Sequence, residues 1–546
     1  MLADAAESPL RAGSSQPGIA RKGVVGADPG ARPAAPVVEG AAPPPEAPTP
    51  KAAPKAFRIN RIKFEGNQIV PTAELEAIAK SLEHRQVTLP ELKALTAKIR
   101  ALYQGKGYIL ARAAIPPQKL KSGGDVRVVV SEGKYGAIQI EGNKHYSSKF
   151  IRRFFSPAMH LGIVEETSLQ RTLLILNEQP DLTVRSLFVP GTAPGTSDVL
   201  LKVHDRTAFH YGLDYNNYGS PLVGRNRGGL ALWLGNLIQE SDEFTARYTE
   251  PFPSQSKPLI QGGYATPIDN RGSRLNYSYS NAATVVSGDL AVLDIRGNAE
   301  IHSLSYATPL MRTLAKSMNL NAGFVFKTVQ NFVLGTTKVS QDNLRELTAS
   351  VDSNVVKGQT RTLFSVLGTQ GLGSLFGGDL DNAAGHSRVG AGNEFGKLNL
   401  ELFNVRDLGK KQYFLFRFSG QKASKELTVS EQFALGGPDS VRGYLQSDFL
   451  GDDGFSSSLE YRKGIFTSKD RKVNMQAVGF FDFGQATLIL PNVGERSSRT
   501  FAGVGGGVRA SFGRTTSLRL DLGYPLREVN SIGTDAVLYA QLVSKW

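Results

Sequence analysis

From about residue 206 to the C-terminus, apolar and polar residues alternate in short runs separated by turn-forming residues. Such alternation is typical of β-strands, and Gly, Asn, Asp, Ser and Pro between the runs are the expected composition of turns. A soluble sandwich with one solvated face would show the same alternation. The block is too long for one sandwich, and at roughly 20 residues per strand and turn it predicts a barrel of about 16 antiparallel strands. The alternating apolar positions include Phe209, Tyr211, Leu213 and Tyr215, then Leu398, Leu400 and Leu402, and later Leu518, Leu520, Leu522 and Tyr524.

Residues 57 to 205 show a helical period instead, and they contain an internal repeat. The segment Ile62–Asn67 (IKFEGN) recurs 76 residues later as Ile138–Asn143 (IQIEGN). Each copy continues with two amphipathic helices and two strands. The repeat therefore predicts two small α+β domains of β-α-α-β-β order, at residues 57–132 and 133–205.

The helices and strands of both copies can be placed from their apolar spacing. In the first copy a helix opens at Thr88, where Glu91 can complete a capping box. Further elements are expected as strands at 109–115 and 126–131 in the first copy and at 135–141, 182–189 and 198–204 in the second, with second-copy helices at 148–155 and 165–178.

A β-α-α-β-β unit leaves one edge of its sheet unpaired. An unfolded partner can add a strand to such an edge through main-chain hydrogen bonds. We therefore expect the repeats to bind a client, chiefly in the second domain. The alternative is that the two repeats are only spacers.

Residues 1 to 56 have no periodic apolar pattern. Pro33–Pro54 contains eight prolines in 22 residues, which predicts an extended, semi-rigid tether. A short plug helix near Leu2–Arg11 is compatible with the sequence, although its prolines and glycines make the first 30 residues poor material for a long helix. No signal-peptide pattern is visible at Met1–Leu10, so either the numbering describes a mature or engineered form or the protein is not exported, and the rest of the chain favours the first.

The bulk composition narrows the classes of function. No stretch approaches the roughly 18 consecutive apolar residues of a membrane-spanning helix, so any crossing must use strands. The net charge is +14, but Lys and Arg form no basic tract, which disfavours nucleic acid as a partner. Cysteine is absent, by chance or because the chain passes through an oxidising periplasm. We find no motif for catalysis, a cofactor or a metal.

Two short motifs predict an ion pair inside the barrel. Gln432–Tyr444 places Arg442 in a glycine-rich turn, and Phe480–Gly484 places Asp482 in the middle of an apolar strand. A buried arginine needs a partner, and a carboxylate can accept two hydrogen bonds from its guanidinium. An arginine after such a turn is more often an ordinary solvated residue, but the second motif favours pairing. With Asp482 facing inward, its two phenylalanine neighbours should face lipid.

These segments together resemble a known superfamily. The two repeats resemble POTRA domains, and the two short motifs resemble the paired motifs of Omp85 proteins. Gly451–Gly454 and Leu459–Arg462 are similar to the TpsB branch, the two-partner secretion transporters of the haemolysin and haemagglutinin exporter type. The aromatic C-terminal residue Trp546 resembles the terminal signal of outer-membrane barrels. The residues of the paired motifs are Val441, Arg442, Gly443 and Tyr444, with Phe480, Asp482 and Gly484.

The resemblance covers residues 57–546 and carries structural expectations. It implies an all-β transmembrane barrel of about 16 strands at residues 206–546. Two periplasmic POTRA domains would precede it, in the outer membrane of a Gram-negative bacterium. A loop around residues 436–454 would fold into the lumen, with Arg442 at its tip as a latch and Asp482 as its partner on the barrel wall.

The resemblance also implies a function, the secretion of one large β-rich exoprotein through the barrel without ATP, cofactor or catalysis (two-partner or type Vb secretion). The expected partners are an unfolded TpsA-type exoprotein, outer-membrane lipid and lipopolysaccharide, and the barrel-assembly machinery that inserts the protein itself. We expect a monomer. One alternative is an Omp85-type factor that inserts other proteins into the outer membrane, and a passive porin or receptor is a more distant one. If the ion pair is right, reversing both charges should restore part of the secretion that reversing either one abolishes.

Overall fold

The computed structural model describes residues 38–40, 56–118, 123–159, 162–252, 255–381, 384–470, 472–492, 494–527, 533 and 535–546. The chain forms two compact units, one within residues 34–207 and one that holds residues 208–546. The plug helix expected near Leu2–Arg11 lies outside the described residues. Among the described residues, no helix has the length and apolar character needed to cross a membrane.

The first repeat folds as a four-stranded sheet with two helices. The order in the sheet is β3-β2-β5-β4, and β2 and β5 run parallel. The capping box expected at the start of α3 is confirmed, because Thr88 and Glu91 bond to each other's backbone and the Thr88 N–H donates to Glu91 at 2.7 Å. The elements are β2 (Phe57–Glu65), α2 (Thr72–Ala79), η1 (Lys80–Leu82), β3 (Gln86–Val87), α3 (Leu89–Gly105), β4 (Arg112–Ala114) and β5 (Gly124–Ser131).

The strand expected at residues 109–115 is shorter in the structure. It begins only at Arg112, because the N–H of Ala111 donates to the carbonyl of Tyr108 and closes a turn first. This edge of the first sheet is therefore only three residues long.

The second repeat has the β-α-α-β-β order, and among the described residues it has no counterpart of the short strand β3; the fourth strand of its sheet comes from another part of the chain. Here β1 (Val38–Gly40), from the proline-rich segment, pairs in parallel with β7, so the sheet order is β1-β7-β8-β6. The register joins Val38 to Ser186 and Gly40 to Phe188. The other elements are β6 (Lys134–Glu141), α4 (Ser148–Met159), α5 (Glu166–Asn177), β7 (Leu182–Pro190) and β8 (Thr196–Asp205).

Helix α4 extends to Met159, beyond the end at residue 155 that the sequence predicts. Pro157 lies inside the helix and has no N–H for the carbonyl of Arg153. The hydroxyl of Ser156 donates to that carbonyl at 3.0 Å instead. A side chain thus supplies the bond that the proline removes.

The repeated Glu-Gly-Asn segment ends the first strand of each unit in the same way. Gly66 and Gly142 have φ angles of +87° and +90°, a conformation that glycine adopts at little cost. An added Cβ would lie 2.3 Å from the carbonyl oxygen of Val130 in one unit and 2.4 Å from that of Val203 in the other. Glycine is required at both positions by conformation and by space.

A buried carboxylate then holds the turn that follows in each unit. Glu132 accepts the backbone N–H groups of residues 68 and 69 at 2.7 and 2.8 Å. Asp205 accepts those of residues 144, 145 and 146 at 2.7–3.0 Å. Burial opposes ionisation of Asp205, but these three donors lower its pKa below the usual range of an aspartate.

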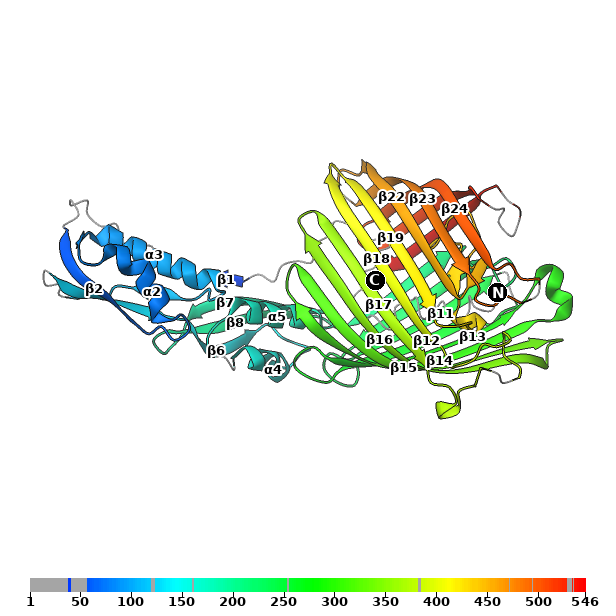
Figure 1. The fold of residues 1–546 in the computed structure, drawn as a ribbon, viewed down its shortest axis with the longest axis horizontal. Coiled ribbons are helices and arrows are strands. Elements are labelled where there is room, and N and C mark those ends of the chain that lie inside the picture. The colour runs from blue at the N-terminus through cyan, green and yellow to red at the C-terminus, as the bar shows by residue number, and fades with distance from the viewer. Residues whose placement is uncertain are drawn as a thin grey trace. The chain divides into compact units, whose positions relative to one another are not determined.

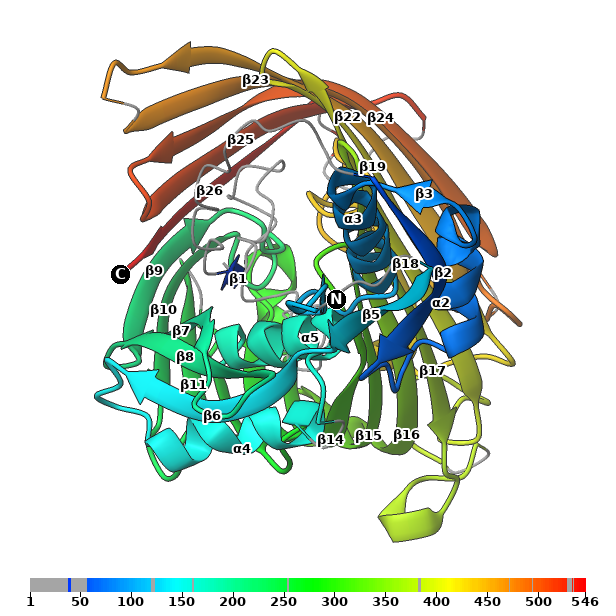
Figure 2. The same cartoon turned by 90° about the vertical axis from the view of Figure 1, so that its left-hand side faces the viewer.

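The second unit is a closed barrel of sixteen antiparallel strands, which confirms the predicted architecture (Figure 1). The ring closes where β26 pairs with β9, and Figure 2 shows these two strands next to each other. The strands are β9 (Phe209–Asn216), β10 (Asn226–Gly235), β11 (Glu243–Phe252), β12 (Leu259–Pro267), β13 (Arg274–Val285), β14 (Arg296–Arg312), β15 (Lys316–Val333), β16 (Thr337–Lys357), β17 (Thr360–Gly371), β18 (Gly396–Gly409), β19 (Gln412–Ala423), β22 (Asp453–Thr467), β23 (Val473–Thr487), β24 (Ser498–Phe512), β25 (Thr516–Pro525) and β26 (Val537–Lys545).

Between β19 and β22 the chain forms a small hairpin that belongs to no part of the ring. Strands β20 (Phe433–Leu435) and β21 (Phe449–Gly451) pair with each other in a separate two-stranded sheet. The short helix η4 (Val429–Glu431) precedes the hairpin, and η2 (Gly288–Leu293) and η3 (Leu375–Gly377) lie in other connections. We call residues 427–452 the inner hairpin.

Candidate functional site: a buried ion network around Arg442

The inner hairpin packs against the inward face of the barrel wall. Along β23, Asp482 is fully buried whereas its neighbour Phe481 is 44% exposed, so the strand alternates as the sequence predicts. Val441 and Tyr444 of the hairpin form an apolar cluster with Phe501 of β24. Apolar packing on the wall therefore brings the tip of the hairpin, and Arg442 with it, to the inward side of β22–β26.

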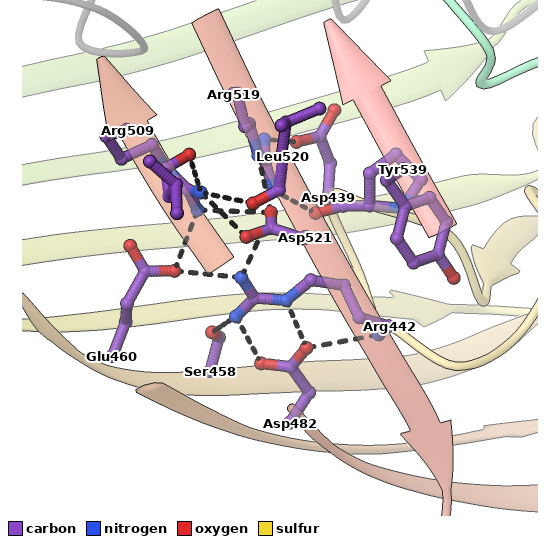
Figure 3. A network of polar contacts seen from close by, with 12 residues as sticks. Asp439, Arg442, Ser458, Glu460, Asp482, Arg509, Arg519, Leu520, Asp521 and Tyr539 are labelled. Carbon is purple, nitrogen blue, oxygen red and sulfur yellow. Dashed lines mark hydrogen bonds and ion pairs between the residues drawn. The ribbon is translucent and has the colours of Figure 1, made fainter. Parts of the chain in front are cut away.

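The structure brings Arg442 and Asp482 together (Figure 3). The guanidinium donates to the two carboxylate oxygens at 2.7 and 2.9 Å, and the backbone N–H of Arg442 donates to the same carboxylate at 3.1 Å. Arg442 is only 2% exposed. The ring of Phe480 lies beneath the guanidinium, 3.3 Å from its central carbon, and adds a cation–π contact.

Arg442 has two further acidic partners that the sequence did not suggest. Its Nη1 lies 2.8 Å from Glu460 on β22 and 3.5 Å from Asp521 on β25. Its Nη2 donates to the hydroxyl of Ser458 at 3.1 Å. One arginine from the hairpin therefore contacts three carboxylates on three strands of the wall.

Three arginines of the wall bond two of these carboxylates, Glu460 and Asp521. Arg509 lies 2.6 Å from Asp521, and Arg462 lies 2.5 Å from Glu460. Arg519 bonds Asp521 at 2.8 Å and reaches the hairpin through the carbonyl of Pro438 at 2.8 Å. A buried charge without a partner is costly. Removal of one member of the network should therefore lower the stability of the folded hairpin by about 3–5 kcal/mol.

Two other residues of the predicted tip, Gly443 and Tyr444, pack closely against the wall. Gly443 has φ of +103°, and a Cβ there would lie 2.7 Å from the backbone nitrogen of Pro525. Its N–H donates to the hydroxyl of Tyr539 at 3.0 Å. Tyr444 stacks on Phe501 with ring centres 3.9 Å apart. The tip is thus held by close backbone approach as well as by charge.

The wall is shaped to receive the hairpin at two glycines. A Cβ on Gly484 would lie 2.6 Å from the carbonyl of Phe455 and 2.7 Å from Leu435 of β20. A Cβ on Gly503 of β24 would lie 1.9 Å from the carbonyl of Arg442. Gly484 belongs to the motif Phe480–Gly484, whereas no sequence pattern indicates that Gly503 touches the same loop.

Trp546 lies at the seam of the barrel, away from the ion network. Its N–H donates to the carbonyl of Tyr211 at 2.9 Å, and the N–H of Tyr211 donates back at 3.2 Å. The two rings stack with centres 5.2 Å apart. The last residue therefore adds one more pair to the β26–β9 closure.

Sequence reasoning found one of the three acidic partners of Arg442. Glu460 stood out only as part of a resembling stretch, and Asp521 and Arg509 not at all. A signal was present, since Arg519 and Asp521 occupy alternate positions of one strand and so share its inward face. Which strands lie beside the hairpin is decided by barrel closure, which the local pattern does not contain.

Two family models match the chain. Residues 195–510, more than half of the chain, match the family model described as "Haemolysin secretion/activation protein ShlB/FhaC/HecB". Residues 57–133 match the model "POTRA domain, ShlB-type".

Two named relatives and one solved structure match this chain over most of its length. The heme/hemopexin transporter protein HuxB of Haemophilus influenzae is 23% identical over 86% of this chain and 84% of its own. The outer membrane transporter CdiB of Dickeya dadantii is 26% identical over 73% and 71%. The structure of CdiB from Escherichia coli superposes with a TM-score of 0.74 at 20% identity, covering 92% of this chain and 93% of that one. The chain belongs to the ShlB/FhaC/HecB family, the TpsB outer-membrane transporters of two-partner secretion.

Proposed function

We propose that the protein is the outer-membrane pore for one large exoprotein, and that this client first binds as an extended strand at β7 of the second POTRA domain. The observation that supports it is β1, a segment from a distant part of the chain that already adds to β7 by parallel backbone pairing over Ser186–Phe188. An edge that accepts one extended segment by main-chain bonds can accept another, since such bonds require no particular side chains.

The part of the β7 edge next to Ser186 is already occupied by a side chain. The N–H and carbonyl of Val184 bond the side-chain amide of Asn177, at 2.8 and 3.0 Å. The amide therefore occupies the edge next to the three residues that β1 covers. A client that adds to this edge must replace β1, and the segment Val38–Gly40 becomes an internal competitor.

The first POTRA domain is less suited to strand addition. Its edge strand β4 has only three residues. At the other edge β3 pairs with the first two residues of β2, and residues 83–85 bond the backbone of Ile59, Asn60 and Ile62. Short or covered edges resist addition of a further strand. We assign client capture to the second domain for this reason.

The inner hairpin would then act as the latch of the pore. It is held by a buried ion network and by apolar packing, so passage of a chain requires that it be released or rearranged. The energy would come from binding and from folding of the client outside the cell, without ATP. The site contains charges arranged for mutual neutralisation, and we propose no catalytic role for them.

We extend the proposal to the location of the domains and to the partners of the barrel. The POTRA domains would lie in the periplasm, where they meet an unfolded TpsA-type client before it reaches the barrel. The outward face of the strands, with exposed Phe209, Tyr248 and Leu304 among others, would contact lipid and lipopolysaccharide. Insertion would depend on the barrel-assembly machinery, and the transporter would act as a monomer.

Deletion of the gene tests secretion against the rival function of assembly. We expect one large exoprotein to disappear from the culture medium while other outer-membrane barrels stay at normal levels, as measured by mass spectrometry of medium and membranes. A general fall of outer-membrane barrels, with no exoprotein specifically lost, would identify an assembly factor.

A reversible disulfide tests the role of the β7 edge. Glu39 and Leu187 are partners in the β1–β7 register, and adjacent strands bring partner Cα atoms to about 5 Å, within reach of a disulfide. The chain has no cysteine, so the double variant E39C/L187C contains a single possible pair. Oxidation should stop secretion of that exoprotein by at least tenfold, and reduction should restore it.

The two single-cysteine variants are the controls, and both should secrete normally under either condition. Normal secretion by the oxidised double variant, with the disulfide shown by mass spectrometry, would remove β7 as the docking edge.

A further inference from the structure

The stretch Gly451–Gly454 lies at the opposite end of the inner hairpin from Arg442, and the tip network does not account for it. Asp452 sits where β21 ends and β22 begins, and it is fully buried. One of its carboxylate oxygens accepts the N–H of Leu427 at 3.0 Å and the amide of Gln432 at 3.2 Å. The other accepts the N–H of Ile489 at 2.7 Å. Asp452 therefore joins the two ends of the hairpin to the connection after β23.

The charge of Asp452 is balanced by an arginine from a third segment. Arg388 lies in the connection between β17 and β18 and is 6% exposed. Its Nη1 is 2.6 Å from the Asp452 carboxylate. Its Nη2 donates to the carbonyls of Ile489 and Leu490 at 3.1 and 3.2 Å. One buried pair thus ties the β17–β18 connection, the base of the hairpin and the β23–β24 connection to each other.

Close packing prevents Asp452 from moving by itself. A Cβ on Gly451 would lie 2.7 Å from the backbone nitrogen of Thr487, and one on Gly454 would lie 2.4 Å from the ring of Phe433. The same base is fixed to the wall by Glu431, which Lys397 approaches to 2.7 Å. The base can leave its place only as a unit, and then the pair with Arg388 must break.

We propose that Arg388 and Asp452 form a second lock of the pore, one that couples the β17–β18 connection to release of the inner hairpin. The two residues are positioning residues, because they hold the hairpin and are not assigned contact with a client. Release of the tip at Arg442 alone leaves the base in place. A full opening requires the second pair to break as well, and the β17–β18 connection is then freed together with the hairpin.

This inference rests on the proposed pore function, but its test uses no client. The purified full-length protein is placed in planar lipid bilayers, with potassium chloride as the conducting ion. We expect R388M and D452N each to raise the frequency of large-conductance openings at least tenfold. Because both act on one contact, the double variant should open no more often than the more active single variant.

A spin label reports on the coupling directly. Val389 is 85% exposed and next to Arg388, and a nitroxide on V389C is unique in a chain without cysteine. Its spectrum should become markedly more mobile in R388M and D452N, and R388K should return part of the immobile fraction. A label on K410C, in the distant β18–β19 turn, should not change.

The matched control for lost packing is R345M. Arg345 also bonds the β17–β18 connection, at the carbonyl of Phe376, but no hydrogen bond from it to the inner hairpin is found among the described residues. The variant R345M should leave the frequency of large-conductance openings unchanged. Folding of every variant is checked by its heat-sensitive migration in gels, and R388K replaces R388M if the latter does not fold. Unchanged openings and an unchanged V389C label in folded R388M, R388K and D452N would overturn the second lock while leaving the secretion function intact.

Discussion

The two POTRA domains share their turn chemistry and differ at their sheet edges. In both, a glycine with positive φ ends the first strand against a carbonyl, and a buried carboxylate holds the next turn. The edge strands are unlike, because β4 has three residues whereas β7 has nine and carries β1. The repeat has kept what the fold needs and changed what a partner would touch.

Substitution of the glycine that ends the first strand of each domain is the strongest test of the shared turn. We expect G66A and G142A each to lower the free energy of unfolding of their domain by about 2–4 kcal/mol, because a side chain meets both an unfavourable φ and a carbonyl oxygen. Thermal unfolding of the 34–207 unit, which holds two complete hydrophobic cores, measures the effect. G105A, at the end of α3 with no atom near the added Cβ, is the control. A marked difference between the two turn variants would contradict equivalence of the repeats.

The buried carboxylates should give smaller effects that separate the two domains. E132Q and D205N should each lower the free energy of unfolding by about 1–3 kcal/mol, because a neutral amide oxygen accepts the N–H groups of the turn more weakly than a carboxylate does. In urea titrations the E132Q variant should lose the first domain and D205N the second. If both variants unfold the same domain first, the assignment of one carboxylate to each turn is wrong.

The pH dependence of the second domain carries a definite sign. The folded-state pKa of Asp205 is lowered, so its contribution to stability is complete above the unfolded value of about 4. That contribution is lost as the pH falls through the lower folded pKa. The difference in stability between the natural protein and D205N should therefore shrink below about pH 4 and stay constant near neutrality. A difference that grew on acidification would contradict the assigned pKa shift.

The smallest change in free energy should come from weakening the pairing of β1 with β7. E39P removes a backbone donor from the centre of β1 and should weaken its hold on β7 by about 1 kcal/mol. The exoprotein identified by gene deletion should then bind the 34–207 unit a few times more tightly, as measured by calorimetry with its purified N-terminal region. T49P, in the same proline-rich segment but outside β1, is the control. Weaker binding by E39P would mean that β1 assists the client and does not compete with it.

The tip of the inner hairpin shows where the sequence stops being sufficient. A simple Arg442–Asp482 pair predicts that reversing both charges restores function. The structure changes that expectation, because R442D would place a carboxylate beside Glu460 and Asp521 as well. We now expect R442D/D482R to secrete no better than either single variant. Recovery by the double variant would show that Asp482 dominates the network.

The sequence by itself determined the alternating strands, the repeated β-α-α-β-β units, the capping box at Thr88 and the motifs that contain Arg442 and Asp482. These features are local, since each is set by spacing of two or 3.6 residues or by one turn. Only the tertiary structure decided which wall strands face the hairpin, that Arg388 meets Asp452, and that Val38–Gly40 covers β7. Such contacts join residues 64 and about 150 positions apart, and closure of the barrel and the sheets, not the local pattern, brings them together.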